Sequence, residues 1–222
     1  MNFLAAFLLT IYDDEEADVS DSTEPTRPED VVLMMMQAIL ASPLKGLVSD
    51  DMSLAGLTAD TALLLKLTEA HLPAVAARLH ELQIKLTIVT PRWFVCMFVT
   101  AIPSLDVCAH LWDVILWRGS CGRAVLVWTA LCLLASCQLS LQAADGYGEA
   151  VQVLRQCGAN VTSVYDLMVR APLPLAQCVQ EWQQHSTNAA MVSDAEAVET
   201  RLLEERLAAV MRCDTDSVDS DG

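Results

Sequence analysis

Hydrophobic residues along this chain recur mainly at helical spacing, and short segments rich in proline, glycine or acidic residues separate the apolar runs. The predicted helices cover residues 1–12, 31–41, 59–70, 73–82, 91–102, 105–117, 124–142, 149–157, 163–171 and 175–184. Strict alternation of apolar and polar residues, which a half-buried strand requires, rarely lasts beyond four positions. The pattern therefore predicts an all-α protein, built as an array of packed helices.

Proline, serine and glycine mark several of the expected helix ends. Pro91 has the fixed φ that suits a first helical turn, and it opens a helix expected to run as far as Pro103. Ser104 follows as a candidate N-cap for the helix at 105–117, because its hydroxyl can accept a free backbone N–H. Gly119 then separates this helix from the long apolar run that follows it.

Most of the negative charge lies in two segments. The chain has 222 residues and a formal net charge of −16. Residues 13–30 hold nine acidic residues and one arginine, and residues 194–222 hold nine acidic residues and three arginines. We expect 13–30 to be a disordered acidic loop after a helix at 1–12, which is apolar on every side and so predicted to be buried. Nucleic-acid binding is not expected, because phosphate neutralisation requires clustered Lys and Arg.

The composition predicts one helical domain with a C-terminal appendage. The domain is expected to span residues 1–184, and a linker is expected at 185–192. Ser193 and Glu196 have the spacing of a capping box, which predicts the start of a polar helix at 193–213. Residues 214–222 are expected to form a disordered acidic tail.

Residues 124–144 raise the alternative of a small helical membrane protein. This run of 21 residues carries no charge, and its length suffices to cross a bilayer. It also contains Thr129, Ser136 and Gln138 on and around one side, and a buried helix of a bundle explains the run equally well. We favour the buried helix and expect no integral insertion into a membrane.

The cysteines and histidines do not form a recognisable chemical motif. None of the eight cysteines has the two-residue spacing of a zinc or redox site, so reduced structural thiols are expected. The four histidines do not match a His-Glu-x-x-His site, and no P-loop, G-x-G-x-x-G or G-x-S-x-G pattern occurs. We therefore predict no catalytic residue, no metal site and no cofactor.

A series of anchors between residues 79 and 119 resembles a known helical family. The anchors, in order, are Trp93, Phe94, Phe98, Pro103, Trp112, Asp113 and Gly119. Their order and spacing resemble the C-terminal half of the TBC domain of Rab GTPase-activating proteins. The opening residues Met1, Asn2 and Phe3 resemble the segment that follows the glutamine finger of that family.

The resemblance implies an all-α fold and a role in regulating small GTPases of the Rab family in vesicle traffic. It implies mainly structural roles for the ten anchor residues, with the aromatic ones in the core. Asp113 is expected to face solvent or to pair with a basic group or helix end. The expected location is the cytoplasm, at the periphery of endomembranes.

TBC proteins accelerate GTP hydrolysis with an arginine finger in Ile-x-x-Asp-x-x-Arg and a glutamine finger in Tyr-x-Gln. The arginine offsets charge on the transferring phosphoryl group, and the glutamine orients the attacking water. Neither pattern occurs in these 222 residues. We therefore expect that this chain is not an enzyme and does not accelerate hydrolysis alone. It could be a fragment of a longer activator, or a finger-less protein that binds or scaffolds a partner.

Overall fold

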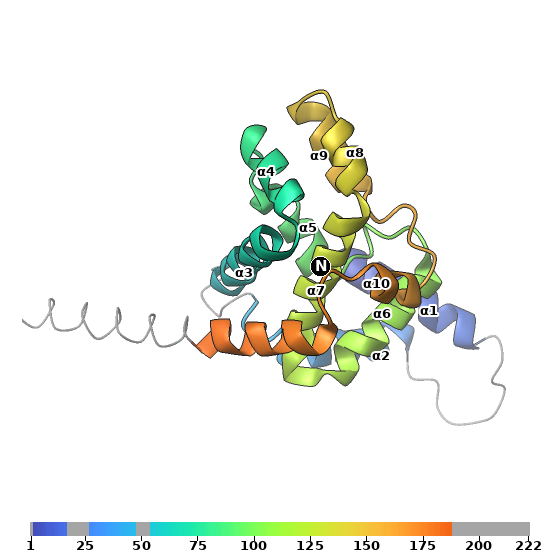
Figure 1. Ribbon diagram of the computed structural model, residues 1–222. Coiled ribbons are helices and arrows are strands. Elements are labelled where there is room, and N and C mark those ends of the chain that lie inside the picture. Colours follow the sequence, from blue (N-terminus) through green and yellow to red (C-terminus); the bar gives the residue numbers. More distant parts are fainter. Residues whose placement is uncertain (1, 17–26, 48–53, 188–222) are drawn as a thin grey trace, which may run out of the picture. The chain divides into compact units, whose positions relative to one another are not determined.

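The computed structural model describes residues 2–16, 27–47 and 54–187, and within them it confirms an all-α protein without β-strands (Figure 1). The α-helices are α1 (Asn2–Glu16), α2 (Pro28–Ala41), α3 (Ala55–His71), α4 (Pro73–Glu81), α5 (Thr90–Val95), α6 (Leu105–Trp117), α7 (Gly122–Ser136), α8 (Gln138–Ala143), α9 (Tyr147–Gln156) and α10 (Val164–Arg170). Two short 3-10 helices are η1 (Leu86–Ile88) and η2 (Gly119–Cys121). The chain divides into two compact units, Met1–Gln183 and Gln184–Gly222.

The first two helices extend into the segment predicted as an acidic loop at 13–30. Helix α1 continues to Glu16, since no proline or glycine precedes Pro25 to stop it. Helix α2 begins at Pro28, with Glu29 and Asp30 in its first turn. Proline at the first helical position and acids beside the positive helix end both favour this start. The loop prediction was therefore wrong at both ends, and residues 17–26 lie outside the described part.

Helix α1 is buried on one face, which corrects the prediction of burial all round. Leu4, Phe7 and Leu8 lie in the core, whereas Ala6 and Thr10 are exposed. Small or weakly polar residues tolerate solvent, so an apolar sequence of this kind needs only one covered face.

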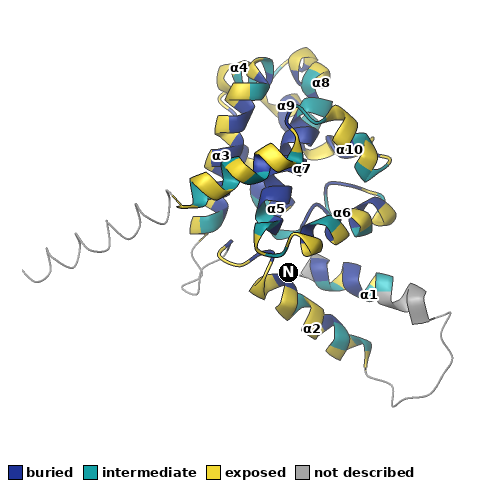
Figure 2. Ribbon diagram, turned by 60° about the horizontal axis from the view of Figure 1, so that its bottom comes forward, coloured by how far each residue is buried: buried dark blue, intermediate teal, exposed yellow. Residues whose placement is uncertain are grey.

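Helix α7 is the most buried helix among the described residues, and α3, α6 and α10 pack against it (Figures 1 and 2). Every residue from Ala124 to Leu134 is buried. The indole of Trp128 donates a hydrogen bond to the Leu173 carbonyl at 3.0 Å, so even the polar edge of this side chain is satisfied inside the protein.

The long apolar run is two helices and not the single helix predicted at 124–142. Helix α7 ends at Ser136, and α8 begins after Cys137. Among the described residues, one stretch, Gly119–Ser136, is long and apolar enough to cross a membrane, and 67% of it is buried inside the protein. Burial of this extent is typical of a core helix, as the buried-helix interpretation of the run predicts.

The helix predicted from Pro91 to Pro103 ends much earlier. Helix α5 stops at Val95, and the chain then turns through Met97 and Phe98, whose φ angles are 44° and 65°. Residues with side chains adopt this left-handed region at a cost. The spacing of Trp93, Phe94 and Phe98 therefore predicted one helical face. In the structure, Phe98 lies in the turn after the helix, and its side chain is buried in the core.

Of the predicted C-terminal segments, only the start of the linker lies within the described residues. The chain is helical over 175–187, so the linker predicted at 185–192 begins inside a helix. The helix predicted at 193–213 and the tail predicted at 214–222 lie outside the described residues.

Candidate functional site

The aromatic anchors singled out from the sequence form one cluster in the core. Trp93, Phe94 and Phe98 are each fully buried. The ring centroids of Trp93 and Phe98 lie 6.2 Å apart in a stacked arrangement, and those of Phe94 and Phe98 lie 6.3 Å apart, edge to face. Such pairs stabilise a core beyond the area they bury. These residues determine packing and do not line a binding surface.

Trp112 joins this cluster to two other elements. Its indole nitrogen donates a hydrogen bond to the Met97 carbonyl at 3.0 Å, which satisfies a backbone group in the left-handed turn. On its other side, the ring of Phe7 from α1 lies 4.5 Å from the ring of Trp112, centroid to centroid. Trp112 therefore fixes the first helix and the turn after α5 against α6.

The remaining anchors lie at or near the surface. Pro103 is exposed and directly precedes Ser104, whose hydroxyl accepts the Val107 N–H as the N-cap of α6. Asp113 is exposed on α6, so its carboxylate is hydrated and needs no buried partner. Gly119 has a φ of 52°, a conformation that glycine adopts without steric cost.

The opening residues of the chain can be placed only in part. Met1 lies outside the described residues, and Asn2 and Phe3 belong to the first turn of α1, where only the helical backbone is described. Figure 2 shows the start of α1 beside the end of α2.

An exposed aromatic residue lies close to this end of the helix pair. Trp117, the last residue of α6, is 84% exposed, and the Arg118 guanidinium lies 5.7 Å from the centre of its ring. A Cβ placed on Gly119 would lie 3.8 Å from the Ser42 hydroxyl, so this corner of α6 adjoins the chain just after α2. We call the surface of Trp117 and Arg118 the Trp117 corner.

The position of Trp117 along α6 is a weak signal for this corner. The buried face of α6 is formed by Val107, Cys108, Leu111, Trp112 and Ile115. Trp117 falls outside that helical stripe, which predicts an outward-facing side chain. An indole held in solvent with a cation over its face is a feature that protein interfaces favour, since Trp and Arg are enriched among the residues that dominate binding energy.

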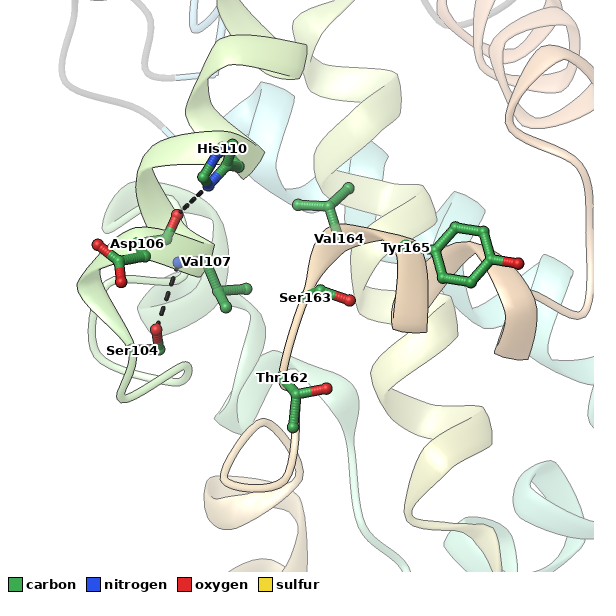
Figure 3. Close-up of a pocket in the computed structure, with 8 residues that line it drawn as sticks. All are labelled: Ser104, Asp106, Val107, His110, Thr162, Ser163, Val164 and Tyr165. Carbon is green, nitrogen blue, oxygen red and sulfur yellow. Dashed lines mark hydrogen bonds between the residues drawn. The ribbon is translucent and has the colours of Figure 1, made fainter.

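A hollow of about 340 Å³ lies between the first turns of α6 and α10. Figure 3 shows His110 and Val164 facing it from the two helices, whereas the ring of Tyr165 extends away from α6. The His110 Nδ1 lies 2.7 Å from the Asp106 carbonyl oxygen, to which it donates as the Nδ1–H tautomer. Ser163 accepts the Asp166 N–H at 3.0 Å and thereby caps α10. The Ser163 bond caps the start of α10, and the His110 bond lies within the first turns of α6.

Comparison with known proteins gives one family and several curated relatives. The model of the Rab-GTPase-TBC domain matches residues 1–142. Growth hormone-regulated TBC protein 1 of Xenopus tropicalis is 26% identical over 170 residues, which cover 76% of this chain and 44% of that protein. The human protein of the same name is 30% identical over 120 residues, covering 54% of this chain and 31% of the relative. Growth hormone-regulated TBC protein 1-A of Danio rerio is 24% identical over 199 residues, which cover 87% of this chain and 50% of that protein.

The chain thus spans half or less of the length of these relatives. No solved structure matched it. The family that the matching model describes comprises GTPase-activating proteins. This match overturns our expectation that the chain is not an enzyme, because that expectation rested only on two short finger patterns and not on the class of the domain.

Proposed function

We propose, because the chain belongs to the Rab-GTPase-TBC domain family, that it binds a small GTPase of the Rab type and regulates GTP hydrolysis in membrane traffic. The observation that carries this proposal is the family match over residues 1–142, which includes the start of α1 and all the aromatic anchors. As part of the same proposal, the protein acts in the cytoplasm at the surface of endomembranes.

The Trp117 corner is the proposed contact surface for the GTPase. The segment that opens α1 resembles the one that follows the glutamine finger of the family, so a bound GTPase is expected near the start of this helix. The Trp117 corner adjoins that place through the end of α2. Trp117 and Arg118 supply a large apolar face and a positive charge, and both suit a partner surface that buries the indole.

The role proposed for Trp117 and Arg118 is to bind the GTPase beside the centre at which GTP is hydrolysed. Acceleration of hydrolysis requires groups that offset the charge on the γ-phosphoryl and orient water. The two finger patterns do not occur in the 222 residues. We infer that the helices of this chain bind the GTPase and hold it at such a centre.

The experiment is a binding and hydrolysis assay with purified protein. A panel of Rab GTPases, each loaded with GDP or with a non-hydrolysable GTP analogue, is titrated and followed by calorimetry, and GTP hydrolysis is measured in single turnover with the protein in excess. Saturable binding to at least one Rab is expected. No binding to any Rab by a protein shown to be helical by circular dichroism would contradict the proposal. The hydrolysis measurement tests the proposed regulation: a changed rate is expected for at least one Rab that binds, and an unchanged rate for every Rab that binds would contradict it.

One substitution tests the contact surface. Trp117→Ala should weaken binding by about tenfold, or about 1.4 kcal/mol, because an interface tryptophan commonly contributes this much or more. Leu139→Ala is the matched control, because Leu139 on α8 is also a large apolar side chain and is 79% exposed. The affinity of the Leu139→Ala variant for the GTPase should stay within about twofold of that of the original protein. An equal loss in both variants, or no loss in Trp117→Ala, would remove the Trp117 corner from the interface.

A further inference from the structure

Two buried cysteines lie together at the ends of α7 and α9. Cys137 follows the last residue of α7, and Cys157 follows the last residue of α9. The hydroxyl of Ser136, which precedes Cys137, donates to the Leu133 carbonyl at 2.8 Å and lies 3.5 Å from the Cys157 carbonyl oxygen. Both thiols are free and buried. The two helix ends therefore bring residues twenty positions apart in the sequence into contact.

The two thiols differ in their readiness to ionise. Cys137 donates its S–H to the Leu134 carbonyl at 3.4 Å. A side-chain hydrogen bond from Cys157 lowers the pKa of the Cys137 thiol, because the bond stabilises its thiolate. The same bond, together with burial, raises the pKa of the Cys157 thiol well above its usual value. Cys137 is thus the thiol of the pair that deprotonates first.

The pair borders a cavity that a small polar molecule can enter. The cavity has a volume of about 360 Å³. Cys137 and Cys157 line it together with polar side chains that include Ser140, Gln156, Asn160 and Arg170. A polar lining of this kind holds water and admits a polar oxidant of similar size.

A second pair of thiols in the same protein provides a contrast. Cys132 on α7 and Cys178 on the helical segment 175–187 are both completely buried. Burial raises the pKa of each to about 12, and the two sulfurs interact electrostatically. The Cys178 thiol lies 3.7 Å from the Ala124 carbonyl oxygen, to which it donates. Neither thiol lines the cavity that Cys137 and Cys157 share.

We propose that Cys137 and Cys157 are a modification site, at which a small peroxide converts the two thiols into a reversible disulfide. The Cys137 thiolate attacks hydrogen peroxide, so an S–O bond forms, the O–O bond breaks, and the leaving hydroxide takes up a proton to become water. The sulfur of Cys157 then attacks that of Cys137, so the S–S bond forms, the S–O bond breaks, and a second water leaves with the Cys157 proton. Two thiols are oxidised, and one peroxide is reduced to two waters. A thiol reductant reverses the change.

The tryptic peptides of this chain distinguish the possible disulfides. The sequence between Arg123 and Arg155 has no lysine or arginine, so Cys132 and Cys137 fall in peptide 124–155. Cys157 falls in peptide 156–170, and Cys178 falls in peptide 171–201. The experiment treats the reduced, full-length protein with about one equivalent of hydrogen peroxide, alkylates the remaining thiols, and measures linked peptides by mass spectrometry.

The expected product is the link between peptides 124–155 and 156–170, at least about tenfold more abundant than any other link, and lost after dithiothreitol. It should persist in Cys132→Ser and in Cys96→Ser, and it should disappear in Cys137→Ser and Cys157→Ser. A dominant link from 124–155 to 171–201, a disulfide within 124–155, or the absence of any link in the original protein would overturn the proposal. If a serine variant does not fold, fragment ions of the linked peptides from the original protein distinguish Cys137 from Cys132, and a link through Cys132 would overturn the proposal.

Discussion

Two buried threonines differ in what their hydroxyl groups do. Thr68 on α3 donates a hydrogen bond to the Leu64 carbonyl at 2.7 Å. Thr129 on α7 is equally buried, but its hydroxyl has no hydrogen-bond partner among the described residues. A buried hydroxyl without a partner loses its hydration and gains nothing in return.

Replacing Thr129 by valine should therefore stabilise the protein. Thr129→Val removes the unpartnered hydroxyl and keeps the branched shape, so we expect the free energy of unfolding to rise by about 1 kcal/mol. Thr68→Val is the matched control and should lower it by about 1 kcal/mol, because it removes a formed hydrogen bond. Urea unfolding followed by circular dichroism measures both. A loss of stability in Thr129→Val would mean that this hydroxyl has a partner in solution.

The C-terminal end of α4 shows how a single helix is stopped. Gln83 has a φ of 54°, its N–H donates to the His80 carbonyl, and the N–H of Ile84 donates to the Leu79 carbonyl. This is the paired hydrogen-bond pattern of a helix end that uses a left-handed residue, a position where glycine is preferred. The exposed glutamine therefore carries a steric cost that its side chain does not offset.

Gln83→Gly should raise the free energy of unfolding by about 0.5–1 kcal/mol, because glycine adopts the left-handed conformation without strain. Ala77→Gly tests the same residue type at an exposed, right-handed position in α4. Ala77→Gly should lower the free energy of unfolding by about 1 kcal/mol, since glycine is unfavourable in the interior of a helix. Thermal and urea unfolding of the two variants should therefore move in opposite directions. Destabilisation by both would show that the glutamine side chain contributes to this helix end.

The sequence predicted the helices better than it predicted their ends. Pro73 and Ser104 marked their helix starts correctly, because fixed φ and a capping hydroxyl act locally. Glu29 and Asp30 were assigned to a loop, although they lie in the first turn of α2, where their charge favours a helix start. The turn at Phe98 could not be predicted, since burial of the aromatic cluster and the hydrogen bond from Trp112 to the Met97 carbonyl, both contacts between separate elements, stabilise its left-handed backbone.

The candidate site was predicted less completely than the fold. The anchors of the family lie mostly in the core, where residue type and order are strongly constrained by packing. Trp117 belongs to no anchor motif, and its proximity to the end of α2 depends on contacts between elements distant in sequence. Contacts of that kind determine a surface only once the helices are assembled.

At the scale of the compact unit 1–183, three distant segments meet at one buried carboxylate. Asp60 of α3 accepts a hydrogen bond from Arg123 Nε of α7 at 2.8 Å, and another from the indole of Trp182 at 2.9 Å. The Arg123 guanidinium also donates to the Gly56 carbonyl at 2.9 Å and lies 5.6 Å from the centre of the Trp182 ring. The charge of Asp60 thus holds α3, α7 and the helical segment 175–187 together.

Asp60→Ala should destabilise the protein far more than removal of a surface charge does. The substitution leaves Arg123, whose side chain is 12% exposed, without its carboxylate partner, and it leaves the Trp182 N–H without an acceptor. Removing one partner of a buried ion pair costs about 3–5 kcal/mol.

Glu181→Gln is the matched control, because Glu181 lies next to Trp182 in the sequence. Glu181 pairs with Lys66 at 3.5 Å on the surface, where an ion pair contributes about 0–1 kcal/mol. Urea unfolding should separate the two variants by at least about 2 kcal/mol. Equal losses would mean that the Asp60 contacts do not join these segments in solution.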